Sequence, residues 1–137
     1  MKYPTKEKIL RKDPKIREKT FKIIMSWKKE FLKDWKNTPK DIKFQRLATL
    51  IIAISLIGYN KIPIVRRGDS DYYVPKEYAI YLNKNNPSIL TALHETAHFL
   101  HGPSELTACR WSIYLFRTCF PTLYNKLTWK GHLLVKS

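Results

Sequence analysis

Cysteine and glycine are scarce in this chain of 137 residues, which has 2 cysteines and 4 glycines. Two cysteines cannot form a disulfide framework. Cys109 and Cys119 also lie ten positions apart on one predicted helix, too far apart to be bridged. The first forty residues are rich in lysine and lack the apolar segment of a signal peptide. We therefore expect a cytoplasmic protein with free thiols.

A long hydrophobic run is also missing. The most apolar stretch, residues 47–58, has 12 residues, whereas a helix needs about 20 to span a bilayer. We predict that this stretch is a buried core helix, and we expect no membrane span. The chain length and the hydrophobic content of 44% suit a single small domain over residues 1–137.

Acidic residues are few, because 11 Asp and Glu stand against 26 Lys and Arg, for a formal net charge of +15. Residues 1–46 hold 16 of these bases and 6 of the acids. We therefore predict a basic N-terminal helical segment over residues 1–39. Such a charge can attract nucleic acid, anionic lipid or an acidic partner. It is also typical of the lysine-rich, solvated surface of thermophile proteins, which the single glutamine, Gln45, slightly favours.

Apolar periodicity and turn residues predict four helices and three short strands, and hence an α+β fold. The aromatic residues among the lysines of the first helix, Trp27, Phe31 and Trp35, could stack on nucleic-acid bases. Their spacing is nevertheless more typical of the core face of a helix. The predicted helices cover residues 15–36, 40–59, 89–101 and 105–120, and the predicted strands cover residues 62–66, 72–74 and 77–83.

The chain is organised around a His-Glu-x-x-His motif, Leu93-His94-Glu95-Thr96-Ala97-His98-Phe99-Leu100. Histidines at positions i and i+4 lie on one helix face, about 6 Å apart along the axis, so both imidazoles can reach one Zn²⁺ ion. Glu95 can turn toward the open side of the metal, where a general base accepts a proton from water. The alternative is a core helix with two hydrogen-bonded histidines.

A catalytic zinc site needs a third protein ligand, and His101 and Glu105 are the nearest candidates. His101 lies about 10.5 Å along the axis from His94, so three histidines on a straight helix would not converge. Gly102 and Pro103 end the helix, and Glu105 starts a second helix that can fold back beside the first. We therefore predict Glu105 as the ligand, which leaves one coordination position open. The alternative is a carboxylate stabilised by the helix dipole.

The segment His94-Glu95-Thr96-Ala97-His98, followed by Glu105-Leu106-Thr107-Ala108, resembles the gluzincin class of zinc metallopeptidases. The small size and layout are most similar to the minigluzincins, minimal soluble relatives of membrane metallopeptidase catalytic domains. The resemblance covers about residues 72–120. It implies a zincin-like fold, in which N-terminal helices and a small, mostly antiparallel sheet pack on the motif helix and the following glutamate helix.

The resemblance also implies a zinc-dependent endopeptidase with Glu95 as its general base. The strand before the motif helix would be the edge strand that binds extended peptide substrate, through Tyr78, Ala79, Ile80 and Tyr81. Cys109 stands where these families often have an aspartate that orients a histidine ligand. Because cysteine is a weaker acceptor, either another residue orients His94 or the site is less well held.

The C-terminal tail, residues 128–137, is apolar and carries His132. We predict that it occupies the cleft of its own chain or of a neighbour, with His132 near the metal, and so keeps a zymogen latent. A frayed terminus and an extra edge strand are the alternatives. A function of a different class also stays open, namely a basic nucleic-acid-binding protein whose zinc site is structural or vestigial.

Overall fold

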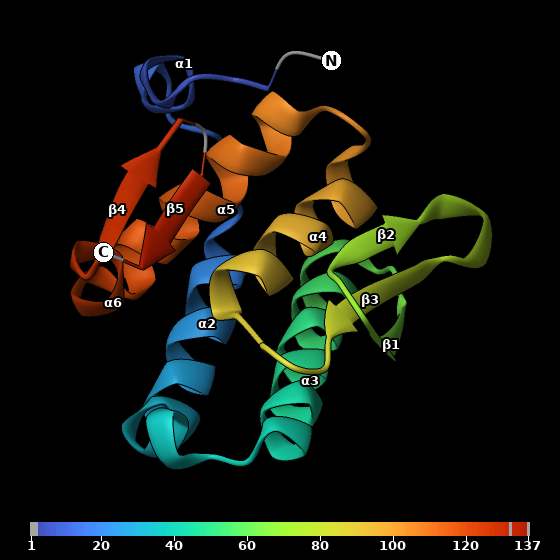
Figure 1. Cartoon of the computed structure of the whole chain (residues 1–137). Helices are drawn as coiled ribbons and strands as arrows, with labels where there is room; N and C mark the ends of the chain where they lie inside the picture. Colours follow the sequence, from blue (N-terminus) through green and yellow to red (C-terminus); the bar gives the residue numbers. More distant parts are fainter. Residues whose placement is uncertain (1–2, 132, 137) are drawn as a thin grey trace.

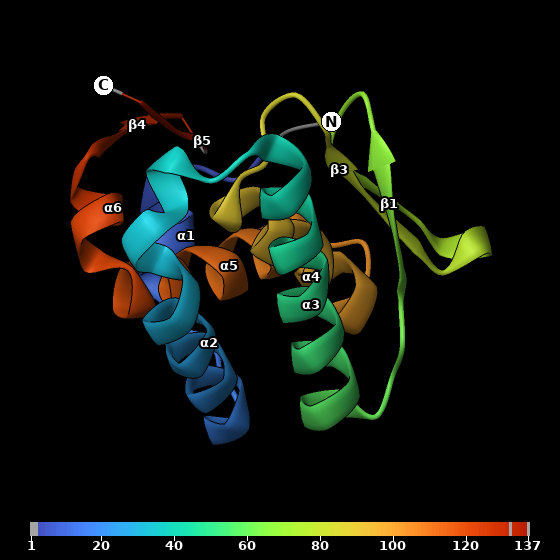
Figure 2. The same cartoon turned by 90° about the horizontal axis from the view of Figure 1, so that it is seen from below.

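The computed structural model describes residues 3–131 and 133–136 and has an α+β fold (Figure 1). A three-stranded sheet and a two-stranded hairpin lie on opposite sides of the helices in both views (Figure 1 and Figure 2). The helices are α1 (Lys6–Arg11), α2 (Glu18–Phe31), α3 (Lys40–Tyr59), α4 (Ile89–His101), α5 (Glu105–Cys119) and α6 (Pro121–Asn125), with short 3-10 helices η1 (Leu32–Asn37) and η2 (Pro75–Glu77). The strands are β1 (Ile64–Gly68), β2 (Tyr72–Val74), β3 (Ala79–Asn83), β4 (Leu127–Lys130) and β5 (Leu133–Lys136).

Aromatic side chains join α2 to the start of α3. The Trp27 side chain is 5% exposed, and its ring lies edge-on to those of Phe31 and Trp35. Its indole N–H donates to the Arg46 carbonyl at 2.9 Å. The core-face prediction is therefore confirmed for Trp27. The single helix expected over residues 15–36 is instead α2 followed by η1.

Helix α3 crosses the core, and its buried side chains face α2 and α4. The apolar run lies within a helix of 20 residues. By length and composition alone this helix could therefore cross a membrane, with a mean hydropathy of 1.4 over 18 residues. The prediction of a core helix relied on the short length of the run. That length does not distinguish a core helix from a membrane span, because the helix extends beyond the run. In this fold 39% of that window is buried.

Two isoleucines on α3 test its role as a core helix. Ile54 is fully buried, whereas Ile57 is 57% exposed. Ile54→Ala should lower the free energy of unfolding by about 2–5 kcal/mol, because it leaves a cavity. Ile57→Ala should change that free energy by less than about 0.5 kcal/mol. Urea denaturation of the two purified variants measures the difference, and equal losses would contradict the described orientation of α3.

The three-stranded sheet is mixed. Strand β3 pairs in parallel with β1, from Ile64↔Ala79 to Gly68↔Asn83, and antiparallel with β2. The strand order is therefore β1-β3-β2, with β3 in the centre. The sheet was expected to be mostly antiparallel. That prediction is wrong, because the longer of its two ladders, between β1 and β3, is parallel. The chain reverses direction twice, once between β1 and β2 and again through η2 between β2 and β3, so β1 and β3 run parallel.

The described part of the tail forms a β-hairpin rather than a single extended segment. Strands β4 and β5 pair antiparallel, with Gly131 at a φ of +64° in the turn. Trp129 and Leu134 pack on a small apolar cluster that contains Ile9 of α1 and Ile113 of α5. The hairpin therefore ties the C-terminal region to α1 and α5.

Candidate metal centre

Helix α4 presents the two motif histidines toward α5. The Ser88 hydroxyl caps the start of α4 by accepting the Thr91 N–H at 3.3 Å. Leu93 and Ala97 are fully buried in the core and hold the helix from its other side. Gly102 ends it at a φ of +100°, a conformation that glycine adopts without a Cβ clash. The sequence predicted both of these boundaries.

Helix α5 folds back against α4 after this break, and the two helices form the most extensive contact in the described fold. The Ser104 hydroxyl caps α5 by accepting the Thr107 N–H at 3.2 Å. Ala108 and Ser112 are each 1% exposed at the helix contact. Their small side chains allow a close approach, which brings the first turn of α5 opposite the histidines.

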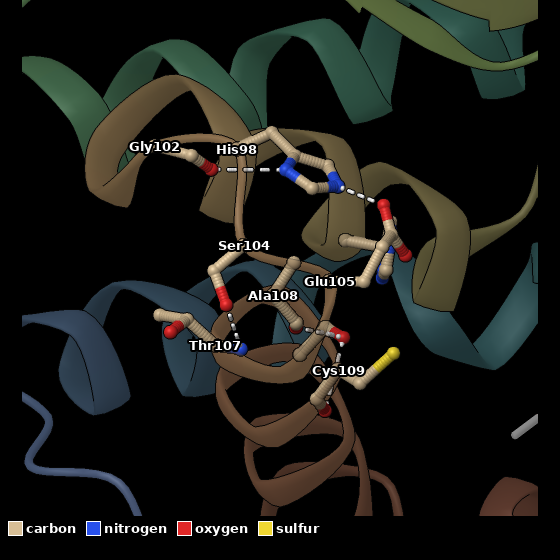
Figure 3. A network of polar contacts seen from close by, with 9 residues as sticks. His98, Gly102, Ser104, Glu105, Thr107, Ala108 and Cys109 are labelled. Atoms are coloured by element: carbon tan, nitrogen blue, oxygen red, sulfur yellow. Dashed lines mark hydrogen bonds and ion pairs between the residues drawn. The ribbon is translucent and has the colours of Figure 1, made fainter. Parts of the chain in front are cut away.

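Glu105 lies between His94 and His98. One carboxylate oxygen, Oε1, is 2.8 Å from His98 Nε2, and Oε2 is 3.3 Å from His94 Nε2. The two imidazole rings are nearly perpendicular, with centroids 4.9 Å apart. Figure 3 shows His98 held from both sides, by Glu105 at Nε2 and by the Gly102 carbonyl 3.0 Å from Nδ1. The structure thus brings together the three residues that the sequence predicted as ligands.

These donors fit a zinc ion. The Gly102 carbonyl can only accept, so His98 Nδ1 carries a proton and Nε2 is the nitrogen left to bind a metal in the neutral ring. Two ligand atoms at 2.0–2.1 Å from a tetrahedral zinc are about 3.3 Å apart. The His94–Glu105 separation of 3.3 Å has this value, whereas the His98–Glu105 separation of 2.8 Å is a hydrogen-bond distance that a bound ion would lengthen. Two imidazoles and one carboxylate form a typical catalytic zinc set.

Glu95 is buried beside this cluster, at 8% exposure, and lines the same cleft as His98 and Glu105. Burial raises the pKa of Glu95 from its ordinary value of 4.5 to about 7, opposed by His98 and reinforced by Asp71 and Glu105. A carboxyl group that titrates near neutral pH suits proton transfer to and from a substrate.

The raised pKa of Glu95 predicts how the stability of the metal-free protein depends on pH. The folded state holds the Glu95 proton more tightly than the unfolded state, so stability should fall as pH rises from about 4.5 to about 7. The full effect is on the order of 3 kcal/mol. Glu95→Gln removes this titration, so its stability advantage over wild type should grow over that range. Urea denaturation with a chelator measures it, and a difference independent of pH would contradict the expectation.

Cys109 lies one turn beyond Glu105 on α5 and is 3% exposed. His94, Glu105 and Cys109 each offer a ligand atom, and these atoms all lie within 4.8 Å of one another. Burial, and then the charge of Glu105, raises the pKa of the Cys109 thiol to about 12 in the absence of a cation. The residue that departs from the gluzincin pattern is therefore within reach of the metal ligands.

A cleft of about 690 Å³ opens over the cluster. One wall comes from α4 and the start of α5, and the other comes from β2 and the turn before it. Sequence reasoning missed Asp71, Tyr72 and Tyr73 on this second wall, because a turn aspartate and a short aromatic strand carry no local sign of a site. The wall residues that bear on the chemistry are Asp71, Tyr72, Tyr73, Glu95, His98 and Glu105.

The substrate-binding edge predicted at Tyr78, Ala79, Ile80 and Tyr81 is wrong. Strand β3 is paired on both sides, by β1 and by β2, so it has no free edge for a peptide, and the Ala79 and Ile80 side chains are fully buried. Tyr78 precedes the strand in the left-handed region, at a φ of 54°. Alternation in sequence identifies a strand but not its neighbours, which tertiary packing decides. Among the described residues, β2 has β3 as its only strand partner and lies against α4.

His101, which helix geometry disfavoured as a ligand, contacts the aromatic rings of Tyr59 and Trp111. The His101 ring packs edge-on against Tyr59, with centroids 5.4 Å apart. No described residue of the β4–β5 hairpin lines the cleft, so the expected self-occupancy is not found for that part of the tail. His132 lies outside the described residues.

The chain matches no protein-family model, no curated protein and no solved structure. The geometry of the cluster and the cleft therefore carries the functional argument.

Proposed function

We propose that this protein is a zinc-dependent peptide hydrolase with a zincin-like fold, resembling the gluzincins and most of all the minigluzincins. One observation carries the proposal. His94 and His98 of α4 meet Glu105 of α5 at 3.3 and 2.8 Å, beside the buried Glu95 and in an open cleft. Two histidines on a helix and a glutamate from the next helix suit a zinc site with one position for water.

The chain's own residues divide the chemistry between them. His94, His98 and Glu105 would hold the ion, and the Gly102 carbonyl keeps His98 in the tautomer that would bind it through Nε2. A bound zinc would act as a Lewis acid on the scissile carbonyl and would lower the pKa of water. Glu95 accepts the proton of the attacking water and returns it to the leaving amine.

Strand β2 is the better candidate for the substrate-binding edge. It pairs with β3 on one side, and Tyr72 and Tyr73 line the cleft. An extended peptide can add to such an edge by main-chain hydrogen bonds, which puts its scissile bond near Glu95. The tyrosine side chains would then contact the side chains of the peptide.

Zinc-dependent cleavage tests the proposal. The purified protein should contain about one zinc per chain and cleave casein, lose activity on dialysis against a chelator, and regain it with added zinc. A protein that binds zinc stoichiometrically and cleaves neither casein nor a mixed peptide library would contradict the hydrolase function. Nucleic-acid binding is less favoured, because the Trp27 ring is 5% exposed and packs in the core, where bases cannot stack on it.

A further inference from the structure

The side chain of Cys109 shares the space of the proposed zinc ligands. Its Sγ atom lies within 4.8 Å of the ligand atoms of both His94 and Glu105. In a tetrahedral site a thiolate at 2.3 Å from zinc stands about 3.6 Å from a nitrogen or oxygen ligand. The sulfur is therefore at most about 1 Å farther from the ligand atoms of His94 and Glu105 than it would be in such a site. Figure 3 shows Glu105 and Cys109 projecting from successive turns of α5.

The other side of Cys109 is packed by both ends of the chain. Cys109 forms a cluster with Ile9 of α1 and Ile113 of α5, against which Trp129 and Leu134 of the hairpin pack. The Arg110 guanidinium fixes α1 nearby through the Lys8 carbonyl. These contacts keep bulk water from the sulfur and hold the sulfur close to the proposed zinc ligands.

Charge balance favours a thiolate in this position. Two neutral imidazoles and one carboxylate leave a zinc ion with a net charge of +1, and burying such a charge is costly. A thiolate makes the set neutral. Zinc commonly accepts sulfur together with histidine, and four protein ligands complete a closed tetrahedral site.

We propose that Cys109 is the fourth protein ligand of the zinc ion and that it keeps the site closed to water in most molecules, while a minor open form accounts for the wild-type hydrolysis. On binding, the S–H bond breaks, its proton leaves to the solvent and a sulfur–zinc bond forms. On opening, the sulfur–zinc bond breaks, the sulfur regains a proton from the solvent and a water oxygen takes the free position. The coordination stands on its own, whereas its inhibitory effect rests on the proposed hydrolase function. Latency would then come from within α5 rather than from a tail that fills the cleft.

Cobalt substitution tests the ligand directly, because Co²⁺ bound to a thiolate gives a near-ultraviolet sulfur-to-metal charge-transfer band. The chain supplies its own control in Cys119, which is equally buried on α5 and packs in the main core instead. We expect the band in Co²⁺-loaded wild type and Cys119→Ala, and its loss in Cys109→Ala at equal cobalt content. Stoichiometric cobalt without the band in wild type would overturn the proposal, as would a band that survives in Cys109→Ala.

Peptide hydrolysis by the same zinc-loaded variants tests the closing of the site. Cys109→Ala should exceed wild type by about tenfold or more, and Cys119→Ala should equal wild type. Wild type and Cys109→Ala could hydrolyse peptides at equal rates even though Co²⁺-loaded wild type shows the charge-transfer band. That result would overturn the proposal that Cys109 closes the site. If all variants are inactive while the band behaves as expected, Cys109 is a ligand of a structural zinc site, and the hydrolase function is the proposal that fails.

Discussion

Replacing Glu95 with glutamine is expected to lower zinc-dependent peptide hydrolysis by about 10²–10⁴-fold, the usual contribution of a general base. Glutamine keeps the size of the buried side chain but cannot accept a proton. Because Glu95 is not among the proposed ligands, the variant should bind zinc as tightly as wild type. The folded protein should not be weakened either, since glutamine removes a carboxyl group whose pKa burial raises to about 7.

Steady-state cleavage of one peptide, measured with zinc content and a thermal melt on the same samples, separates these effects. The loss should appear in kcat rather than in KM, because Glu95 acts on the reacting water. Glu30→Gln on the exposed face of α2 is the matched control and should leave all three measurements unchanged. A Glu95→Gln variant that keeps more than about a tenth of the wild-type kcat would remove Glu95 from the mechanism.

Replacing Glu105 with glutamine is expected to weaken zinc binding by more than about 100-fold, since even the outer partners of metal ligands contribute 10–100-fold. Glu105 supplies the only proposed carboxylate ligand and contacts both histidines. At a zinc concentration that saturates wild type, the variant should lose about 2.7 kcal/mol of zinc-dependent stabilisation for each 100-fold loss of affinity.

Glu18→Gln is a matched control for this experiment, because Glu18 is also the acidic residue in the first turn of a helix but is far more exposed. If Glu105 serves only the helix dipole, both variants should lose a few tenths of a kcal/mol with or without zinc. The ligand role instead predicts a large loss for Glu105→Gln alone, seen only with zinc. Chelator competition and thermal melts measure it, and equal zinc affinities of Glu105→Gln and wild type would exclude Glu105 as a ligand.

Local signals made much of the helical framework predictable. The helix of residues 40–59, the motif helix and the start of α5 follow the expected boundaries, because serine caps, the Gly102-Pro103 break and apolar periodicity act within a few residues. Helix α1 and the β4–β5 hairpin were not predicted. Both are short and pack on one small apolar cluster that includes residues of α5, so their own sequences carry weak signals.

By itself the sequence determined the spacing of His94, Glu95 and His98 on one helix and the position of Glu105 just beyond its end, because helical geometry is local. The tertiary structure decided which groups share the space around them. It put β3 in the centre of the sheet and β2 at the cleft, since strand pairing joins distant segments. It also brought the Cys109 sulfur within 4.8 Å of His94, a contact that exists only because α5 packs against α4.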